Sequence, residues 1–212
     1  MIQDAGQEGS LPWASVDAVF DWLDYAGDRT AALKLLVTFH TWLATEATVA
    51  GGIGPAEGDR LWRRHIADSL AFMAGMDPAE AVVDVGSGVG LPGIPLAIAL
   101  PQVQFSLLDR SERRCDLANR AIRILNLSNV EVIHGDARSQ RLPHDAAVSR
   151  AFAAPVEMAV TLRRLLPGGT YAVLGGSHRT TPPLEEGNFE VIRIPAHVLG
   201  DAAWLAKVSL LM

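Results

Sequence analysis

A glycine-rich turn after a short apolar run constrains the fold of this chain more than any other feature of its sequence. The run at 81–85, Ala-Val-Val-Asp-Val, predicts a short buried strand that leads directly into Gly86, Ser87, Gly88, Val89 and Gly90. Glycines allow a tight turn and let a ligand approach the main chain without meeting a side chain. Because ligands of open α/β sheets bind at the carboxyl ends of the strands, the turn predicts a binding site.

Strand patterns alternate with helical patterns over the remainder of the chain. Apolar runs predict further strands at 104–108, 130–133, 146–148, 170–174, 189–194 and 204–211. Helical spacing occupies the intervals at 111–125 and 155–165. This alternation is typical of an α/β fold, in which helices cover both faces of a mostly parallel sheet.

The first third of the chain has helical patterns only. One helix is expected to begin at Ser15, which is its predicted N-cap, and to end at Gly27. Asp28 is expected to cap a second helix, and a third is expected over 57–73. The predicted organisation is a loose tail over 1–14, a helical cap over 15–76 and a ligand-binding domain over 77–212.

Two acidic residues stand where an adenosine-type cofactor would meet them. Asp109 ends the second strand, where a carboxylate can accept hydrogen bonds from both ribose hydroxyls. Asp136 follows the third strand, where its carboxylate is expected to reach the adenine amino group. These features alone leave two cofactors open, because 88–93 also has the G-x-G-x-x-G spacing of dinucleotide-binding proteins and Asp109 also suits NAD.

Three features favour S-adenosylmethionine over a nicotinamide cofactor. The glycine turn begins early, as Asp84-x-Gly-x-Gly-x-Gly, and Asp136 is available for adenine. Two strands also follow the Pro-Gly-Gly turn at 167–169, as in the closing hairpin of class I methyltransferases. The residues therefore predict an S-adenosylmethionine-dependent methyltransferase.

Composition excludes several other classes of protein. The chain has 212 residues, 49% of them hydrophobic, which suits one globular domain with a sizeable core. Its apolar stretches fall well short of the roughly 20 residues that cross a bilayer, and its first ten residues do not resemble a signal peptide. The single cysteine, Cys115, can form neither an intramolecular disulfide nor a metal cluster. We expect a cytoplasmic protein without a bound metal and without a membrane partner.

The charge is unevenly distributed along the chain. Residues 1–59 hold nine acidic and two basic side chains, whereas 60–212 hold fifteen acidic and sixteen basic ones. Only Lys34 and Lys207 are lysines, and arginine suits contacts with phosphate and base edges. An arginine-biased genome would produce the same excess, so the charge leaves nucleic-acid binding open.

Three segments together resemble a known family. They are Arg-His-Ile-Ala-Asp-Ser-Leu at 64–70, Asp-Val-Gly-Ser-Gly-Val-Gly-Leu-Pro-Gly-Ile-Pro-Leu-Ala-Ile at 84–98 and Ser-Arg-Ala-Phe-Ala at 149–153. Over roughly 16–212 the chain resembles the bacterial 16S ribosomal RNA guanine-N7 methyltransferases, also called glucose-inhibited division protein B. The resemblance implies a class I (Rossmann-like) seven-stranded sheet with an N-terminal helical cap. It also implies S-adenosylmethionine as cofactor and 16S ribosomal RNA or the small ribosomal subunit as partner. We expect a monomer.

The glycine turn, the two acids and the resemblance together give a set of expected site residues. Those expected to bind the cofactor are Gly86, Ser87, Gly88, Gly90, Leu91, Asp109, Arg110, Asp136, Ala137, Arg138 and Arg150. Those expected to meet the substrate are Arg64, His65, Asp68, Arg113 and Arg114. The arginines of the second set, with Arg60, Arg63 and Arg110, form a candidate RNA face if the fold brings them together.

Arg150 is the residue we assign to catalysis, since the resemblance puts it at the mouth of the site. It is expected to hydrogen-bond a base edge or a phosphate; the alternative is a structural ion pair with an acid such as Asp84. His65 and Asp68 are likewise expected either to shape the substrate pocket or to join the cap to the sheet. Guanine N7 has a lone pair and no proton, so its methylation needs positioning and exclusion of water but no general base.

The sequence departs from the family pattern on the expected substrate side. Family members usually have an Asn-Leu-Thr segment in the region of 47–52, which this chain lacks. They also usually have a lysine at the position of Leu174 and a basic residue close to the position of Asp201. These losses keep two other hypotheses open. One is a divergent methyltransferase that acts on a small molecule, and the other is a non-catalytic module that binds the cofactor and serves in interaction.

Overall fold

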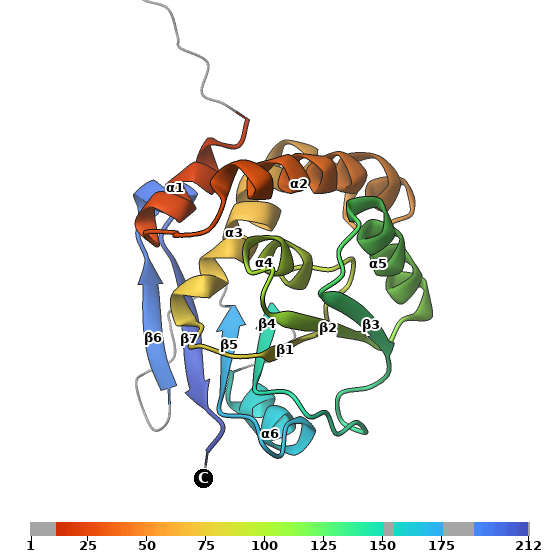
Figure 1. Cartoon of the computed structure of the whole chain (residues 1–212), viewed down its shortest axis with the longest axis vertical. Coiled ribbons are helices and arrows are strands. Elements are labelled where there is room, and N and C mark those ends of the chain that lie inside the picture. The colour runs from red at the N-terminus through yellow and green to blue at the C-terminus, as the bar shows by residue number, and fades with distance from the viewer. Residues whose placement is uncertain (1–11, 151–154, 176–188, 212) are drawn as a thin grey trace, which may run out of the picture.

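The computed structural model describes residues 12–150, 155–175 and 189–211. Within these ranges the chain forms one seven-stranded sheet in the order β3-β2-β1-β4-β5-β7-β6, with helices on both faces (Figure 1). Every neighbouring pair is parallel except β5–β7 and β6–β7. The predicted seven-stranded α/β fold with an N-terminal helical cap is confirmed.

The strands are β1 Ala81–Val85, β2 Gln104–Asp109, β3 Val130–His134, β4 Ala146–Arg150, β5 Tyr171–Gly175, β6 Phe189–Ile194 and β7 Ala203–Ser209. The α-helices are α1 Ala14–Trp22, α2 Arg29–Trp42, α3 Asp68–Leu70, α4 Gly93–Ala99, α5 Glu112–Leu125, α6 Pro155–Leu165 and α7 Ala196–Leu199. Four further helical segments are η1 Leu43–Ala47 and η3 Leu61–Ala67, which are π-helical, and η2 Pro55–Arg60 and η4 Ala71–Gly75, which are 3₁₀-helical.

Burial on both faces explains the continuous apolar runs of the central strands. On β1, Val82 belongs to the hydrophobic cluster on the cap side, whereas Val83 and Val85 belong to the cluster that packs under α6. Asp84 pairs with Leu107 of β2 and Val148 of β4. The parallel register brings the carboxyl ends of β1 to β4 to the same edge of the sheet, where the site lies.

The helical cap shares its core with the sheet. Figure 1 shows α1 and α2 lying across the face of the sheet that α4 and α5 also cover, while α6 lies on the opposite face. Phe20, Leu36 and Phe39 of the cap are fully buried in the same cluster as Ile94 and Leu96 of α4. The boundary predicted between residues 76 and 77 therefore marks a change of pattern within one continuous core.

Three local predictions in the cap are wrong in part or in whole. The first helix ends at Trp22 and not at Gly27. Helix α1 begins at Ala14 with Trp13 as its N-cap, and the Trp13 carbonyl accepts a hydrogen bond from the Val16 amide at 2.8 Å, so Ser15 lies inside the first turn. The single helix expected over 57–73 is a succession of 3₁₀, π and α turns. Apolar spacing cannot distinguish these helix types, which tertiary contacts select. The predicted cap at Asp28 is confirmed by its 3.0 Å hydrogen bond from the Ala31 amide.

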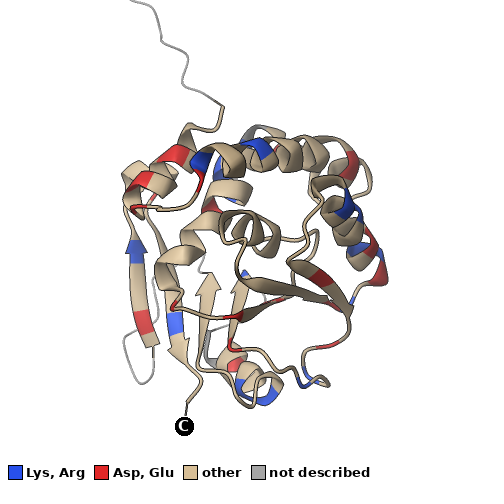
Figure 2. Ribbon diagram, in the orientation of Figure 1, with Lys and Arg blue, Asp and Glu red and all other residues tan. Residues whose placement is uncertain are grey.

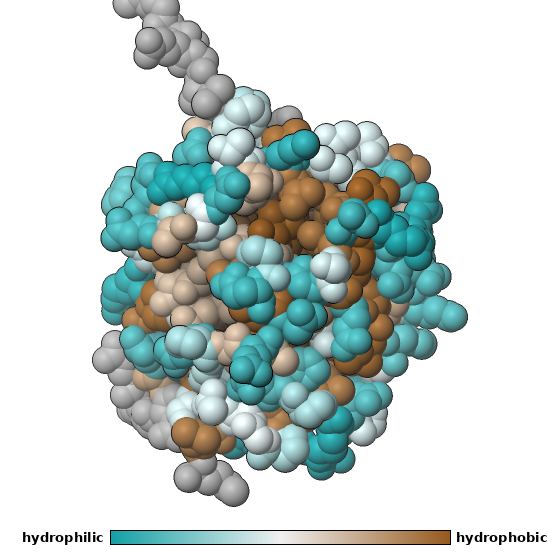
Figure 3. All heavy atoms as spheres, in the orientation of Figure 1, coloured by the Kyte–Doolittle hydropathy of each residue, from teal (hydrophilic) through white to brown (hydrophobic). Residues whose placement is uncertain are grey.

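The surface is mixed in character. Charged side chains lie mainly on the helices, the loops and the strand ends (Figure 2). Hydrophobic atoms reach the surface over α2 and α5 in the view of Figure 3, and Val37 and Ile124 are exposed on these two helices. Among the helices that the structure describes, none is long and apolar enough to cross a membrane.

Candidate active site

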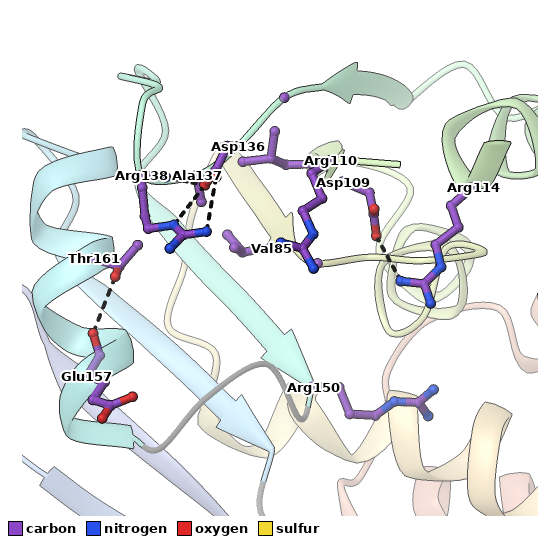
Figure 4. A pocket seen from close by; sticks show the side chains of 13 residues that line it. Val85, Asp109, Arg110, Arg114, Asp136, Ala137, Arg138, Arg150, Glu157 and Thr161 are labelled. Carbon is purple, nitrogen blue, oxygen red and sulfur yellow. Dashed lines mark hydrogen bonds and ion pairs between the residues drawn. The ribbon is translucent and has the colours of Figure 1, made fainter. Parts of the chain in front are cut away.

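A pocket of about 570 Å³ opens at the carboxyl ends of β1, β2, β3 and β4 and extends to α6 (Figure 4). Its lining includes eight of the residues expected from the sequence, namely Gly86, Asp109, Arg110, Arg114, Asp136, Ala137, Arg138 and Arg150. It also includes residues that the sequence did not predict, namely Val85, Leu108, Gly135, Glu157 and Thr161. Of these, Glu157 and Thr161 come from α6, and no motif marked them.

The glycine turn adopts the backbone conformation that only glycine takes readily. Gly86, Gly88 and Gly90 have φ angles of 75°, 59° and 96°. A Cβ atom at Gly88 would meet nothing within 4 Å, whereas one at Gly90 would overlap the Ile94 side chain. Gly88 thus borders open space, while Gly90 allows α4 to pack against the turn.

Four of the expected cofactor residues do not line the pocket, namely Ser87, Gly88, Gly90 and Leu91, and three of these are buried within the turn. Ser87 and Leu91 are buried, with 2% and 5% of their surface exposed, and Gly90 is buried with them. The Ser87 carbonyl accepts hydrogen bonds from the amides of Gly90 and Leu91, each at 2.9 Å. Their contribution is therefore to the shape of the turn.

Asp109 joins the end of β2 to the glycine turn. Its Oδ2 accepts a hydrogen bond from the Gly88 amide at 2.9 Å, and its Oδ1 accepts one from the Ser111 amide at 2.8 Å. The Arg114 guanidinium lies 3.9 Å from Oδ2. An ionised carboxylate has about four acceptor positions, so Asp109 keeps acceptor capacity for hydroxyl groups of a ligand in the pocket.

Asp136 is held by the residue two positions further along the chain. Its Oδ1 accepts a hydrogen bond from the Arg138 amide at 2.9 Å, and the Arg138 guanidinium lies 3.2 Å from Oδ2. The backbone and side-chain hydrogen bonds from Arg138 hold the pKa of Asp136 below its usual value. Between them Ala137 presents only a methyl group to the pocket, which leaves space for a flat ring.

Asp84 lies beneath the glycine turn and is completely buried. Its Oδ2 accepts a 2.7 Å hydrogen bond from the Gly93 amide at the start of α4. Its Oδ1 has no hydrogen-bond partner among the described residues. Burial raises the pKa of Asp84 to about 7, although the Gly93 hydrogen bond and Arg150 oppose the shift. Asp84 therefore fixes the start of α4 and lies outside the pocket lining.

Arg150 connects the pocket to the cap. Its Nη1 donates to the Arg64 carbonyl at 3.2 Å and lies 3.9 Å from Oδ2 of Asp68, and its Nη2 lies 3.4 Å from Nδ1 of His65. The alternative of an ion pair between Arg150 and Asp84 is wrong, because among the described residues the acid within ion-pair distance of Arg150 is Asp68. Figure 4 shows the Arg150 side chain extending toward a helix of the cap.

His65 links Arg150 to a further acid of the cap. Its Nε2 lies 3.2 Å from Oε2 of Glu57, and burial together with Arg150 lowers the pKa of its imidazole. The partners assign the tautomer: a neutral ring that donates from Nε2 to Glu57 presents Nδ1 as an acceptor to Arg150. Glu57, His65 and Arg150 therefore form a polar chain from the surface of the cap to the pocket.

The structure separates the other expected substrate residues. Arg114 lines the pocket, whereas Arg113 donates to the Ala50 carbonyl and lies outside the lining. Arg64 pairs with Asp201 at 4.0 Å. Asp201 lies in the region before the last strand where family members usually have a basic residue.

Leu174, which stands where family members usually have a lysine, is also closely packed. Leu174 is buried, and a Cβ at the next residue, Gly175, would lie 2.8 Å from Phe72 and 3.4 Å from Arg150. This edge of the site therefore leaves little room beside Arg150.

Among the described residues no group of acidic, histidine or cysteine side chains could hold a metal ion. Of the Ser-Arg-Ala-Phe-Ala segment, 151–153 fall outside the described residues.

The fold and the glycine turn define a class I methyltransferase domain. A methyltransferase from Geobacter sulfurreducens matches with a TM-score of 0.56 over 91% of this chain and 96% of its own, at 17% identity. A mutant of MtNAS in complex with S-adenosylmethionine matches with a TM-score of 0.53 over 91% and 83%, also at 17% identity. At these identities the likeness establishes the fold alone.

Sequence comparison identifies the family. The model of the GidB family, described as rRNA small subunit methyltransferase G, matches residues 32–190. The chain belongs to this family, and the resemblance expected from its motifs is confirmed.

Curated relatives named ribosomal RNA small subunit methyltransferase G agree with the family model. The Mycobacterium marinum protein is 44% identical over 127 residues, which cover 58% of this chain and 55% of the relative. That of Corynebacterium glutamicum strain R is 40% identical over 151 residues, or 68% of each chain. That of Mycobacterium sp. strain KMS is 34% identical over 191 residues, or 87% of this chain and 80% of the relative. The first match thus spans little more than half of the relative's length.

Proposed function

We propose that this protein transfers a methyl group from S-adenosylmethionine to N7 of a guanine in 16S ribosomal RNA. The observation that carries the proposal is the composition of the pocket. It combines the glycine turn and Asp109 with four arginines, Arg110, Arg114, Arg138 and Arg150. A small apolar substrate would not need so many cations at the entrance, whereas an RNA phosphate backbone would.

The pocket residues fit S-adenosylmethionine. Gly88 leaves open space beside the turn, and Asp109 retains acceptor capacity for ribose hydroxyls. Asp136 is an ionised acceptor next to Ala137, which suits the amino group and the ring of adenine. These residues would hold the cofactor across the ends of β1, β2 and β3.

The chemistry needs no proton acceptor. When bound, S-adenosylmethionine supplies a methyl group whose bond to sulfur breaks as the N7 lone pair forms the new carbon–nitrogen bond, which leaves a neutral thioether and a positively charged guanine ring. No proton moves in this transfer. The described residues that line the pocket include carboxylates, on Asp109, Asp136 and Glu157, but this transfer would not need any of them as a proton acceptor, and the pocket's contribution would be positioning.

The arginines suit an RNA substrate. The side chains of Arg114 and Arg138 are 58% and 65% exposed at the pocket, so they can meet phosphates without first breaking a buried contact. We propose the small ribosomal subunit as the partner and a cytoplasmic monomer as the acting form. Binding through phosphate contacts would weaken as salt concentration rises.

The test is transfer of labelled methyl from S-adenosylmethionine to small ribosomal subunits that lack the modification, followed by mass spectrometry of the nucleosides. We expect 7-methylguanosine. Its absence, from protein shown to bind S-adenosylhomocysteine, would contradict the proposed substrate and leave the cofactor site in place. A lack of both binding and transfer would contradict the whole proposal.

A further inference from the structure

Three acidic residues line the pocket, and two of them are already engaged. Asp109 accepts hydrogen bonds from the backbone of the glycine turn and from Ser111, and Asp136 accepts them from Arg138. Among the described residues, the Glu157 carboxylate has no hydrogen-bond or ion-pair partner. A ligand in the pocket can therefore use the remaining acceptor positions of Asp109 and Asp136, but only at Glu157 does it meet a carboxylate whose acceptor positions are all open to it.

The local structure explains why Glu157 stands in the pocket. It lies in the first turn of α6, and its carbonyl accepts a 3.3 Å hydrogen bond from the Thr161 hydroxyl one turn later. Both side chains therefore lie on the same face of α6 and line the pocket together. Figure 4 shows the Glu157 carboxylate extending away from the helix, on the side of the pocket opposite Asp109 and Arg114.

We propose that Glu157 recognises the Watson–Crick edge of the target guanine, an inference that rests on the proposed function. Guanine presents two adjacent donors on that edge, the N1 hydrogen and the N2 amino group. A carboxylate has two oxygens that accept hydrogen bonds and no hydrogen to donate, so it is complementary to this pair. Adenine presents an acceptor at N1 and would be rejected.

The same contact would also orient the base for reaction. N1 and N2 lie on the edge of the purine opposite to N7. If Glu157 on α6 holds N1 and N2, N7 points away from α6 and toward the strand ends that carry Gly86 and Asp109. Glu157 would thus act as a specificity-determining residue that presents the reacting atom to the cofactor.

The test variant is Glu157→Gln, and its control on the same helix is Val160→Thr. Glutamine keeps the size of glutamate but replaces one acceptor by a donor, which opposes the guanine amino group or N1 hydrogen. We expect kcat/KM for methylation of small subunits to fall about 10- to 100-fold, as for the loss of a hydrogen bond to a charged group. Affinity for S-adenosylhomocysteine is expected to stay within about twofold, since the variant spares the cofactor contacts. Val160→Thr changes an exposed residue of the same helix that does not line the pocket, and it is expected to change kcat/KM less than about threefold, the scale of a surface substitution.

A substituted substrate sharpens the test. Small subunits reconstituted with inosine at the nucleotide that the wild-type protein methylates keep N7 and the N1 hydrogen but lack the N2 amino group. Wild-type protein is expected to act on inosine about tenfold more slowly than on guanine, and Glu157→Gln is expected to show a smaller ratio. Equal ratios for the two proteins would overturn the assignment.

The outcomes separate the inference from the function on which it rests. Wild-type production of 7-methylguanosine with an unimpaired Glu157→Gln variant overturns the inference and leaves the proposed function standing. A Glu157→Gln variant that loses affinity for S-adenosylhomocysteine also overturns it, because Glu157 would then contact the cofactor. Failure of the wild-type protein to form 7-methylguanosine contradicts the proposed function itself.

Discussion

The two sides of the pocket are held in place by different kinds of contact. On the strand-end side, Asp136 is held by Arg138 two residues away, and Asp109 is held by Ser111 and by the glycine turn. On the cap side, Arg150 is held by Arg64 and His65, which are 86 and 85 residues away in the chain. The strand-end side therefore depends on contacts between residues at most 21 positions apart within the sheet, whereas the cap side depends on how the cap docks. We expect changes on the strand-end side to affect the cofactor and changes on the cap side to affect the RNA.

The largest expected effect is that of Gly88→Val. Gly88 does not itself line the pocket, but it has a φ of 59° and its amide donates to Asp109, which does. We therefore expect a branched side chain at Gly88 to strain the turn and to disturb the Asp109 carboxylate that faces the ligand. Affinity for S-adenosylhomocysteine, measured by calorimetric titration, should fall by more than about 100-fold, or about 2.7 kcal/mol. The control is Gly168→Val, which also meets no neighbour and lies before the amino-terminal end of β5, away from the pocket. Unchanged affinity in Gly88→Val would place the cofactor elsewhere.

Asp109→Ala should have the next largest effect. It leaves the Gly88 and Ser111 amides without their acceptor and removes the acceptor for the ribose. The expected loss of cofactor affinity is roughly 1–3 kcal/mol. The same titration measures it, and circular dichroism shows whether the fold is retained. If Asp109→Ala bound as tightly as wild-type protein, the ribose would not be held by this carboxylate.

Arg150→Lys probes the opposite side of the comparison. Lysine keeps the charge but cannot reach Arg64, His65 and Asp68 with one planar group. We expect kcat/KM on small subunits to fall by about tenfold while affinity for S-adenosylhomocysteine falls less. The reverse pattern, with cofactor binding lost first, would move Arg150 to the cofactor side and remove the distinction between the two sides.

The smallest expected effect is a dependence of stability and rate on pH that arises from the protonation of His65. Burial and Arg150 lower the pKa of His65 below 6.5, so its neutral form is favoured in the folded state. The stability that this provides is present above pH 6.5 and is lost as the pH falls through the lowered pKa. Protonation also removes the Nδ1 acceptor for Arg150, so the rate should fall with the stability.

His65→Gln is the matched variant for this pH dependence. Glutamine can still donate to Glu57 and accept from Arg150, but it does not titrate. Rates and chemical denaturation between about pH 5 and 8 should therefore show a flatter acid limb in the variant. An identical acid limb in both proteins would show that another group titrates.

The same difference between local and distant contacts explains what the sequence could predict. The strands, the glycine turn and the positions of Asp109 and Asp136 follow from runs of a few residues, and the structure places both acids at the pocket. The sequence suggests the wrong partner for Arg150, because Asp84 is near it on the sheet whereas Asp68 comes from the cap. The ion-pair partner of Arg150 depends on how the cap docks on the sheet, which the spacing of residues along the sequence does not determine.

The same reasoning accounts for the residues that the sequence missed. Glu157 and Thr161 line the pocket because α6 packs beside β4 and β5, and nothing in their immediate neighbours marks them. The irregular helical segment over 55–75 likewise has the pattern of one helix, since i, i+3 and i, i+4 spacing is common to several helix types.

The most direct test of the account is a crystal structure of the protein with S-adenosylhomocysteine. We predict that the ligand occupies the pocket at the strand ends, with its ribose hydroxyls within hydrogen-bonding distance of Asp109 and its adenine beside Ala137. Glu157 and the arginines at the pocket entrance should remain available to the substrate. A ligand bound elsewhere, or one whose ribose does not approach Asp109, would contradict the assignment of the two sides.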